Sequence, residues 1–327
     1  MKKIISAAVV CAAAVSLTAC GGNSDDKAGS GSGGGGKQQI TIGVANFGLQ
    51  APYFIAMSKA VQDEAKNYPN VKVIVTDAHS QANQLTTDVH NLLAQHVDGI
   101  IISGGPLNAA PAAMNAIKQK KTPVILVDRK FSGDQYTSWI GPDNTQIGQG
   151  DGSYIADRLG GNGTVAIIRG GPADNTIGLD RTNGVKAALK QAPGIQTVVA
   201  PDFGNWSPDG GLDVMQNLLV KNKKIDAVFC ENDAMCLGAQ KAISNAHRSE
   251  EMFLVAGDGQ KEALKAIVDG TNYAGTALNN ANTIGQMGFN RLLAVLGGAT
   301  PQKDTPLAAP LVTKDNVAQY YDPKSAF

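Results

Sequence analysis

Residues 97–129 read VDGIIISGGPLNAAPAAMNAIKQKKTPVILVDR, and this stretch decides the fold. Two β-branched runs, Gly99–Ser103 and Val124–Asp128, flank a segment over 108–120 whose apolar residues have helical spacing. A strand, a turn, a helix and a second strand form one right-handed unit of a parallel sheet. The stretch therefore predicts an α/β fold in which helices cover both faces of a parallel sheet.

The same alternation continues in both directions along the chain. We expect strands at 40–45, 71–77 and 137–140 and helices at 52–68 and 81–95 around this unit. The pattern then starts again, with strands at 164–168, 195–200, 227–230, 253–256 and 273–278 and helices at 175–191, 208–222, 234–245, 260–268 and 281–296. Two similar doubly wound lobes follow one another, which suits a chain of this length.

Three crossings of the chain form the predicted hinge between the lobes, near Asp143, near Asn279 and near 304–308. The first lobe is predicted from 38–142 together with 280–304. The second lobe is predicted from 143–279 together with 305–327. In open sheets of this kind, ligands meet the carboxyl ends of the strands, so we expect a ligand cleft between the lobes.

The N-terminal residues have the pattern of a targeting segment. Met1, Lys2 and Lys3 precede an apolar run, Ile4–Leu17, that is too short to anchor in a bilayer. The segment looks like a bacterial lipoprotein signal, which implies a signal peptide over 1–19, cleavage before Cys20 and acylation of that cysteine. Residues 20–37 are rich in Gly and Ser and are predicted to be a flexible tether.

Charge and hydropathy exclude two classes of function. The chain has 28 Lys and Arg residues against 28 Asp and Glu residues, and no basic stripe. No apolar run after residue 20 is long enough to cross a membrane. Nucleic-acid binding and an integral membrane fold are therefore not expected.

Two cysteines remain in the folded part, Cys230 and Cys236. In an oxidising compartment the two could form a disulfide, although the spacing would join a strand end to the next helix. Two buried thiols are the alternative. No His or second cysteine pair has ligand spacing nearby, so we expect no metal site.

Polar and aromatic side chains follow the predicted strands at the edge where a ligand would bind. The polar ones are Ser103, Asp128, Arg129, Asn232, Asp258 and Asn279. Carboxylates accept hydrogen bonds from neighbouring hydroxyls, Arg donates in a fixed fork and Asn does both. Phe47, Tyr53, Phe54 and Trp206 can stack on the apolar faces of a sugar. This set predicts a site for a ligand with many hydroxyl groups.

Taken in order, several motifs resemble the periplasmic substrate-binding proteins of sugar ABC transporters, in the ribose-binding-protein-like (type I) group. The motifs are Ala51-Pro52-Tyr53-Phe54, residues 97–102, residues 123–129, residues 214–219, residues 227–238 around Glu231-Asn232-Asp233, and Gly257-Asp258-Gly259. The resemblance covers nearly all of the folded chain.

The resemblance implies roles for single residues. Asp128 and Arg129 would bind adjacent hydroxyls from the first lobe, and Arg181 would donate from the second. Trp206 would stack on the ligand. Departures from the ribose-binding pattern stand at Ala51, Ser103, Gly257 and Asn279, so the family's ribose pattern is incomplete. Another pentose, a hexose or a sugar alcohol would suit the remaining set.

The function implied by the resemblance is capture of a monosaccharide or sugar alcohol by lobe closure, followed by delivery to an ABC-type membrane permease. Such a protein needs no cofactor, and we expect a lipid-anchored monomer in the bacterial periplasm or at the cell surface. Presentation of the ligand to a chemoreceptor or sensor, including a furanosyl autoinducer, is the alternative. A glycosidase that uses Asp128 and Asp258 is a more distant alternative. A DNA-binding repressor of this fold would need an N-terminal helix-turn-helix, where this sequence has the signal pattern and the glycine-rich tether.

Overall fold

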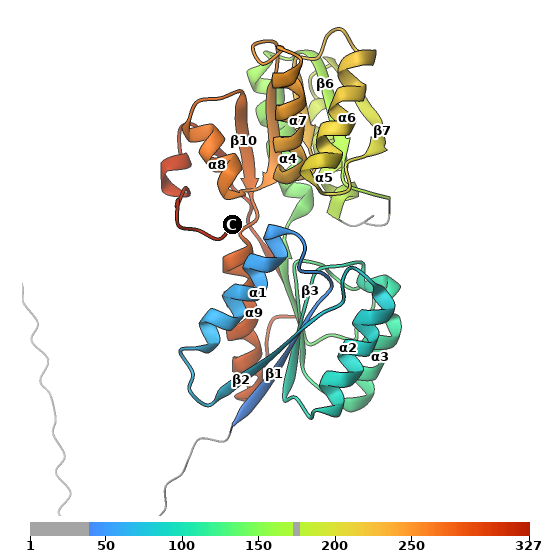
Figure 1. Cartoon of the computed structure of the whole chain (residues 1–327), viewed down its shortest axis with the longest axis vertical. Helices are drawn as coiled ribbons and strands as arrows, with labels where there is room; N and C mark the ends of the chain where they lie inside the picture. The colour runs from blue at the N-terminus through green and yellow to red at the C-terminus, as the bar shows by residue number, and fades with distance from the viewer. Residues whose placement is uncertain (1–38, 173–176) are drawn as a thin grey trace, which may run out of the picture. The chain divides into compact units, whose positions relative to one another are not determined.

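A computed structural model describes residues 39–172 and 177–327 of the chain. The predicted signal peptide, the tether and the lipidation site Cys20 lie outside these residues. Within the described part, two six-stranded sheets are each covered by helices on both faces (Figure 1). The predicted pair of doubly wound α/β lobes is therefore confirmed.

The first lobe is built on a sheet with the strand order β11-β5-β4-β3-β1-β2, in which all neighbours are parallel. Helices α1 and α9 pack together on one face, and α2 and α3 cover the other. The elements are β1 (Ile40–Asn46), α1 (Pro52–Ala65), β2 (Val71–Asp77), α2 (Ala82–Ala94), β3 (Gly99–Ser103), η1 (Leu107–Ala109), α3 (Pro111–Lys120), β4 (Val124–Val127), β5 (Ser138–Pro142), α9 (Ala281–Leu296) and β11 (Asp304–Leu307).

The second lobe has the sheet order β12-β10-β9-β8-β6-β7. Helices α4 and α5 cover one face, and α6, α7 and α8 cover the other. The elements are α4 (Asn144–Arg158), β6 (Asn162–Arg169), α5 (Ile177–Leu189), β7 (Gly194–Phe203), α6 (Pro208–Lys221), β8 (Ala227–Cys230), α7 (Asp233–Asn245), β9 (Phe253–Asp258), α8 (Lys261–Val268), β10 (Tyr273–Leu278), β12 (Leu311–Thr313) and η2 (Val317–Gln319). Strand β12 is antiparallel to β10, unlike the predicted all-parallel sheet.

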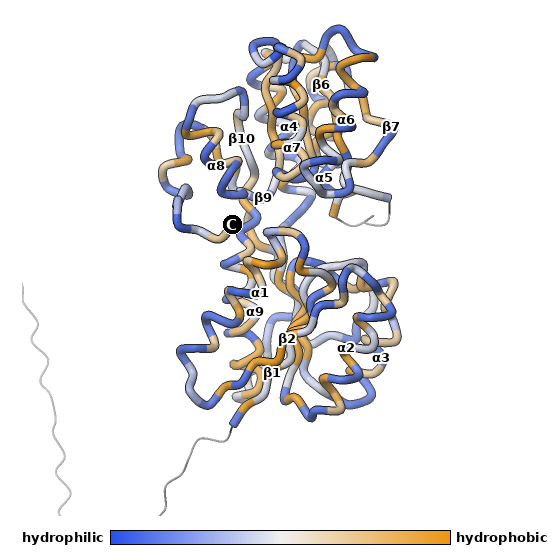
Figure 2. Tube along the Cα trace, in the orientation of Figure 1, coloured by the Kyte–Doolittle hydropathy of each residue, from blue (hydrophilic) through white to orange (hydrophobic). Residues whose placement is uncertain are grey.

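The burial of the central strands explains why residues 97–129 decide the fold. Ile100, Ile101 and Ile102 of β3 are all 0% exposed, because helices cover both faces of the sheet. Figure 2 shows the hydrophobic residues concentrated along such strands, with polar residues at the loops and outer helix faces. Helix α3 starts with Pro111 at its first position, where a missing N–H costs nothing. It ends at Lys120, and the capping residue Lys121 has a left-handed φ of +54°.

Helix α4 was not predicted, because its sequence contains Gly148, Gly150 and Gly152. A glycine inside a helix costs about 1 kcal/mol relative to alanine, so the pattern indicates a loop. In the fold, a Cβ on Gly148 would lie 2.0 Å from the carbonyl oxygen of Arg181. The glycine allows α4 and α5 to pack backbone against backbone. Tertiary packing here outweighs helix propensity.

The chain passes between the sheets three times. It leaves the first sheet after Pro142 into α4 and returns after Leu278 into α9. The third passage lies between β11, which pairs with β5, and β12, which pairs with β10. It therefore occupies 308–310, slightly later than the predicted lobe boundary at 304/305. Two of the edge strands were missed, because β11 contains Pro306 and β12 has only three residues.

Candidate ligand-binding site

Two aspartates occupy matching positions in the two sheets. Asp128 follows β4 and Asp258 ends β9, and each strand is the fourth of its sheet in chain order. Both residues have positive φ, +67° for Asp128 and +120° for Asp258. Aspartate adopts the left-handed region near +67° more readily than most residues, whereas +120° is a strained conformation for any residue other than glycine. Strained backbone tends to cluster at functional sites. Each turns the chain out of the sheet and leaves a carboxyl group at its carboxyl edge.

A chain of hydrogen bonds joins these two carboxyl groups. The hydroxyl of Tyr53 lies 3.1 Å from Oδ1 of Asp128 and 3.1 Å from Oδ1 of Asn279. The Asn279 amide donates to Oδ1 of Asp258 at 3.1 Å. Tyr53 begins α1, whereas Asn279 lies in the second crossing of the chain. The network therefore links the first lobe to the second.

Arg181 fixes the carboxylate of Asp258. Its side chain is 2% exposed, and Nη2 lies 2.8 Å from Oδ1 of Asp258. Nε donates to Oδ1 of Asn144 at 2.9 Å, and Nη1 donates to the backbone oxygen of Glu231. Three groups from different parts of the second lobe thus hold the guanidinium in one orientation. A buried charge held in this way is oriented before any ligand arrives.

Arg129 plays the corresponding part beside Asp128, with a looser geometry. Its Nε lies 3.4 Å from Oδ2 of Asp128, and its guanidinium carbon lies 5.8 Å from the ring centre of Trp206. Trp206 belongs to the second lobe and has a left-handed φ of +58°. Arg129 therefore contacts groups from both lobes, through charge on one side and a cation–π contact on the other.

Burial shifts the pKa values of these groups. It raises the pKa of Asp128, an effect that the Arg129 charge opposes. Burial also lowers the pKa of Arg129. For Arg181, burial acts to lower the pKa, but Asp258 together with Tyr53 and Asp128 outweighs it, and the pKa is raised. Burial, helped by the charge of Asp128, raises the pKa of Tyr53 well above its usual value. The site holds two arginines and a neutral phenol in a region of little solvent.

A cavity of about 630 Å³ lies at this edge of the two sheets. Seven predicted site residues line it, namely Phe47, Tyr53, Phe54, Arg129, Trp206, Asn232 and Asp258. Three more, Asp128, Arg181 and Asn279, connect to these through the hydrogen bonds and ion pairs above. Aromatic walls with a few fixed polar groups are typical of a small-molecule site.

Ser103 lies outside this arrangement. It is 2% exposed at the end of β3, and its hydroxyl lies 3.3 Å from the sulfur of Met57. It is not among the residues that line the cavity. Asn232 has a second task, because it caps α7 by accepting from the backbone N–H of Met235 at 3.0 Å.

The disulfide considered for Cys230 and Cys236 is not formed. Both are free, buried thiols. Cys230 ends β8, while the Cys236 thiol points from α7 toward the backbone oxygen of Val255 at 3.7 Å. The alternative of two buried thiols is the arrangement found. Among residues 39–172 and 177–327, no group of three or more His, Cys, Asp or Glu side chains could hold a metal ion.

Glu231 and Phe327 are among the residues at the site that sequence reasoning missed. Glu231 is 2% exposed, and its carboxylate accepts from the Gly170 N–H at 2.6 Å and from the Thr182 hydroxyl. Glu231 lies next to Asn232 in the motif over 227–238, but the residue pattern there does not distinguish a buried glutamate from one on the surface. Phe327 also lines the cavity, and no periodic pattern around it signals this position.

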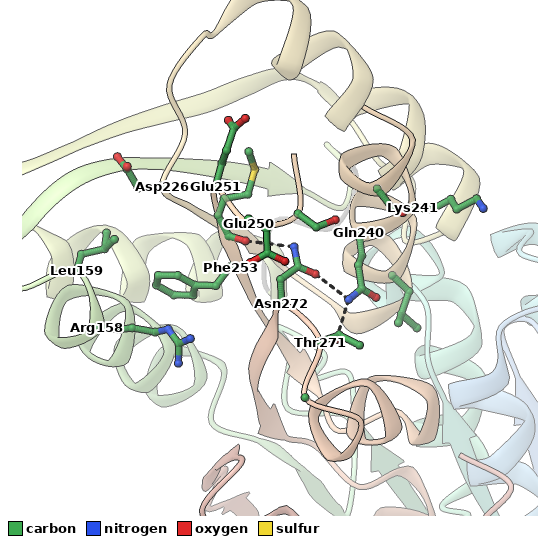
Figure 3. Close-up of a pocket in the computed structure, with 15 residues that line it drawn as sticks. Arg158, Leu159, Asp226, Gln240, Lys241, Glu250, Glu251, Phe253, Thr271 and Asn272 are labelled. Atoms are coloured by element: carbon green, nitrogen blue, oxygen red, sulfur yellow. Dashed lines mark hydrogen bonds between the residues drawn. The ribbon is translucent and has the colours of Figure 1, made fainter. Parts of the chain in front are cut away.

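A larger groove, of about 880 Å³, lies elsewhere on the second lobe (Figure 3). It borders the amino ends of β9 and β10, near Phe253 and Asn272. Figure 3 shows its polar side chains bonded to one another: Gln240 donates to Thr271 and Asn272, each at 3.0 Å. Ligands of open parallel sheets bind at the opposite, carboxyl edge. The groove is therefore not the candidate site.

Comparison with known proteins places the chain in a family. A family model described as a periplasmic binding protein domain matches residues 42–300. The ribose import binding protein RbsB of Bacillus subtilis is 30% identical over 275 residues, which cover 84% of this chain and 87% of that protein. The chain belongs to the periplasmic binding protein family.

Two further comparisons agree with this assignment. The xylitol-binding protein of Mycolicibacterium smegmatis is 28% identical over 277 residues, 84% of this chain and 78% of that protein. An ABC transporter solute binding protein of Bacillus halodurans, solved with bound myo-inositol, has a TM-score of 0.80 and 27% identity. That match covers 88% of this chain and 98% of the other. The likeness thus extends over both lobes.

Proposed function

We propose that the protein is an extracytoplasmic solute-binding protein that captures a pentose, a hexose or a sugar alcohol and delivers it to an ABC-type permease. One observation carries the proposal. Two carboxylate–arginine pairs, Asp128 with Arg129 and Asp258 with Arg181, come from different lobes and meet at one aromatic-walled cavity. Relatives named for ribose and xylitol, and a neighbour solved with myo-inositol, support a hydroxylated ligand.

The hydroxyl groups of such a ligand would use the outer oxygens of the two carboxylates. The hydrogen bonds described above from Asn279 and Arg181 to Asp258 both use Oδ1, and Tyr53 contacts Oδ1 of Asp128. A carboxylate has about four acceptor sites, so Oδ2 of each can accept from a hydroxyl. At Asp128 this oxygen would share its acceptor sites with Arg129, whose Nε lies 3.4 Å away. The rings of Trp206 and Phe54 would pack on the C–H faces of the ligand.

Closure of the lobes would then signal the bound state. A ligand that touches both lobes only when they are closed shifts the equilibrium toward the closed form. The permease would recognise that form, so no cofactor and no catalytic step are needed in this chain. We further propose that Cys20 carries a lipid anchor that holds a monomer at the membrane surface, in the periplasm or on the outside of the cell.

A thermal-shift screen tests the proposal. Pentoses, hexoses, sugar alcohols and furanosyl compounds are added one at a time, since a ligand that binds the folded state raises the melting temperature. Calorimetry then measures affinity for the best ligand with wild type and with Asp128→Asn. Asparagine tolerates the positive φ at this position but removes the charge. We expect affinity to fall at least about ten-fold.

The matched control is Asp77→Asn. Asp77 ends β2 in the same sheet but does not line the cavity, and its carboxylate accepts from the His79 N–H at 2.9 Å. We expect wild-type affinity from this variant. Unchanged affinity in Asp128→Asn, or a response to amino acids and not to any hydroxylated compound, would contradict the proposed function.

A further inference from the structure

The segment 320–327 runs from the second lobe to the first. Val317 is buried in the apolar cluster of the second lobe, and Tyr320 and Tyr321 pack against the same cluster. Phe327, six residues later, is 8% exposed in the cluster formed by α1 and α9 of the first lobe. Figure 1 shows this last segment passing from α8 toward the ends of α1 and α9. It forms a connection between the lobes besides the three crossings.

Polar contacts hold the segment midway along its path. The Lys261 ammonium group, at the start of α8, donates to the backbone oxygen of Ser325 at 2.7 Å. The Asn282 amide, on the first turn of α9, lies 3.4 Å from the Ser325 hydroxyl. One residue of the segment thus contacts both a second-lobe helix and a first-lobe helix. Asp322, Pro323 and Lys324 are exposed.

Phe327 ends this path at the cavity. It lines the cavity and meets the ring of Tyr53 edge to face, with 5.3 Å between ring centres and 78° between planes. Phe54 packs on Tyr53 in the same manner at 5.2 Å. The phenol is therefore held between two rings while its hydroxyl contacts Asp128 and Asn279. An aromatic pair of this geometry contributes beyond the area it buries.

We propose that segment 320–327 is a strap between the lobes and that Phe327 is a positioning and specificity residue of the ligand site. By packing on Tyr53, Phe327 fixes the phenol that links the two carboxyl groups. As part of the cavity wall, it limits the size of the ligand. This inference rests on the proposed function, because it concerns the same cavity.

Calorimetry with a size series tests the strap. Wild type, Phe327→Ala and Phe327→Leu are titrated with glycerol, xylitol, ribose, allose and myo-inositol. For Phe327→Ala we expect the affinity of the preferred ligand to fall about ten-fold. We also expect the preference between six-carbon and five-carbon ligands to shift toward the larger by about three-fold, since the wall has receded. Phe327→Leu keeps apolar volume without a ring edge and is expected to fall between the two.

Two controls separate a binding role from a structural one. Lys324→Ala changes an exposed residue of the same segment and should bind as wild type does. Lys261→Met removes the contact with Ser325 outside the cavity wall; it should lower affinity without changing the preference for ligand size. Melting temperatures without ligand show whether each variant is folded.

The outcomes are distinct. Wild-type affinity and wild-type size preference in folded Phe327→Ala would overturn the strap while leaving the proposed function intact. If Phe327→Ala does not fold, an unchanged size preference in Phe327→Leu would overturn it. Failure of wild type to bind any compound of the wider screen would instead overturn the proposed function, and the strap with it.

Discussion

The two lobes present the same residue at the same point of the sheet, with different surroundings. Asp258 is paired with a buried guanidinium at 2.8 Å and accepts from Asn279. Asp128 has its neighbouring arginine at 3.4 Å and contacts the Tyr53 hydroxyl. Burial raises the pKa of Asp128 even with Arg129 beside it. The two aspartates thus have equivalent positions in the two sheets but different charged and hydrogen-bonding neighbours.

The difference assigns different tasks to the two acids. The second-lobe acid is part of a charge network that the fold requires, because Arg181 is buried and needs a counter-charge. Asp128, in the first lobe, has a weaker ion pair. A ligand that donates hydrogen bonds to its carboxylate would therefore stabilise it more. Substitutions should therefore affect stability in one lobe and affinity in the other.

The largest expected effect is on stability at Asp258. Asp258→Asn leaves the Arg181 charge buried without its partner, which should cost about 3–5 kcal/mol of unfolding free energy. Asp128→Asn should cost less than about 1 kcal/mol, because burial already disfavours the charged form there. Urea unfolding of both variants measures the difference. Equal losses would show that the two acids are supported alike.

A second comparison lies within the second lobe, between Asp258 and Asp151 of α4. Asp151 is 0% exposed, and neither carboxyl oxygen has a hydrogen-bond partner among the described residues. Burial raises its pKa well above the usual value; Arg181 opposes this, while Asp233 and Asp258 add to it. Above pH 4 or so, the unfolded chain loses this proton while the folded chain keeps it, so stability falls as pH rises.

Asp151→Asn should therefore gain stability relative to wild type as the pH rises. The gap should widen by about 1.4 kcal/mol per pH unit until the pH reaches the raised pKa of Asp151 in the folded protein. Unfolding by urea at pH 5, 6, 7 and 8 gives this slope. Taking the difference between variant and wild type cancels the contribution of other acids. A gap that stays constant with pH would show that Asp151 is ionised in the folded protein.

The smallest expected effect is the pH dependence of ligand affinity. A ligand that donates hydroxyl hydrogen bonds to Asp128 favours its charged form, whereas protonation removes an acceptor. Because the pKa of Asp128 is raised, affinity should fall a few-fold as the pH is lowered and this carboxylate takes up a proton. Calorimetry at pH 7.5 and 5 measures this. Asp128→Asn should lose this part of the pH dependence; an identical profile in both proteins would assign it to another group.

Sequence patterns predicted the two lobes because short apolar runs such as β3 alternate with segments of helical apolar spacing. The same patterns missed α4, where Gly148 serves close packing against α5 and lowers the helical signal. They also missed β11, whose Pro306 is tolerated at a sheet edge. The missed elements are those whose stability comes from tertiary contacts.

The grouping of the candidate site residues could be predicted in part, for a related reason. Residues at strand ends could be named because parallel strands bring their carboxyl ends together, and ten of the eleven candidates form one cavity and network. Ser103 also ends a strand, but its side chain points into the helix-covered core. Phe327 reaches the cavity through a segment without regular structure, and Asp151 lies in the unpredicted helix. Neither position follows from local pattern.

Under the proposed function, one hydroxylated ligand forms hydrogen bonds with both Asp128 and Asp258. A crystal structure of the protein with the best ligand of the screen tests it most directly. We predict ligand oxygens within about 3.2 Å of both the Asp128 and the Asp258 carboxylates, with an aromatic ring of the cavity against the ligand. A ligand that contacts only one of these carboxylates, or that lies in the groove beside Phe253 and Asn272, would contradict the account.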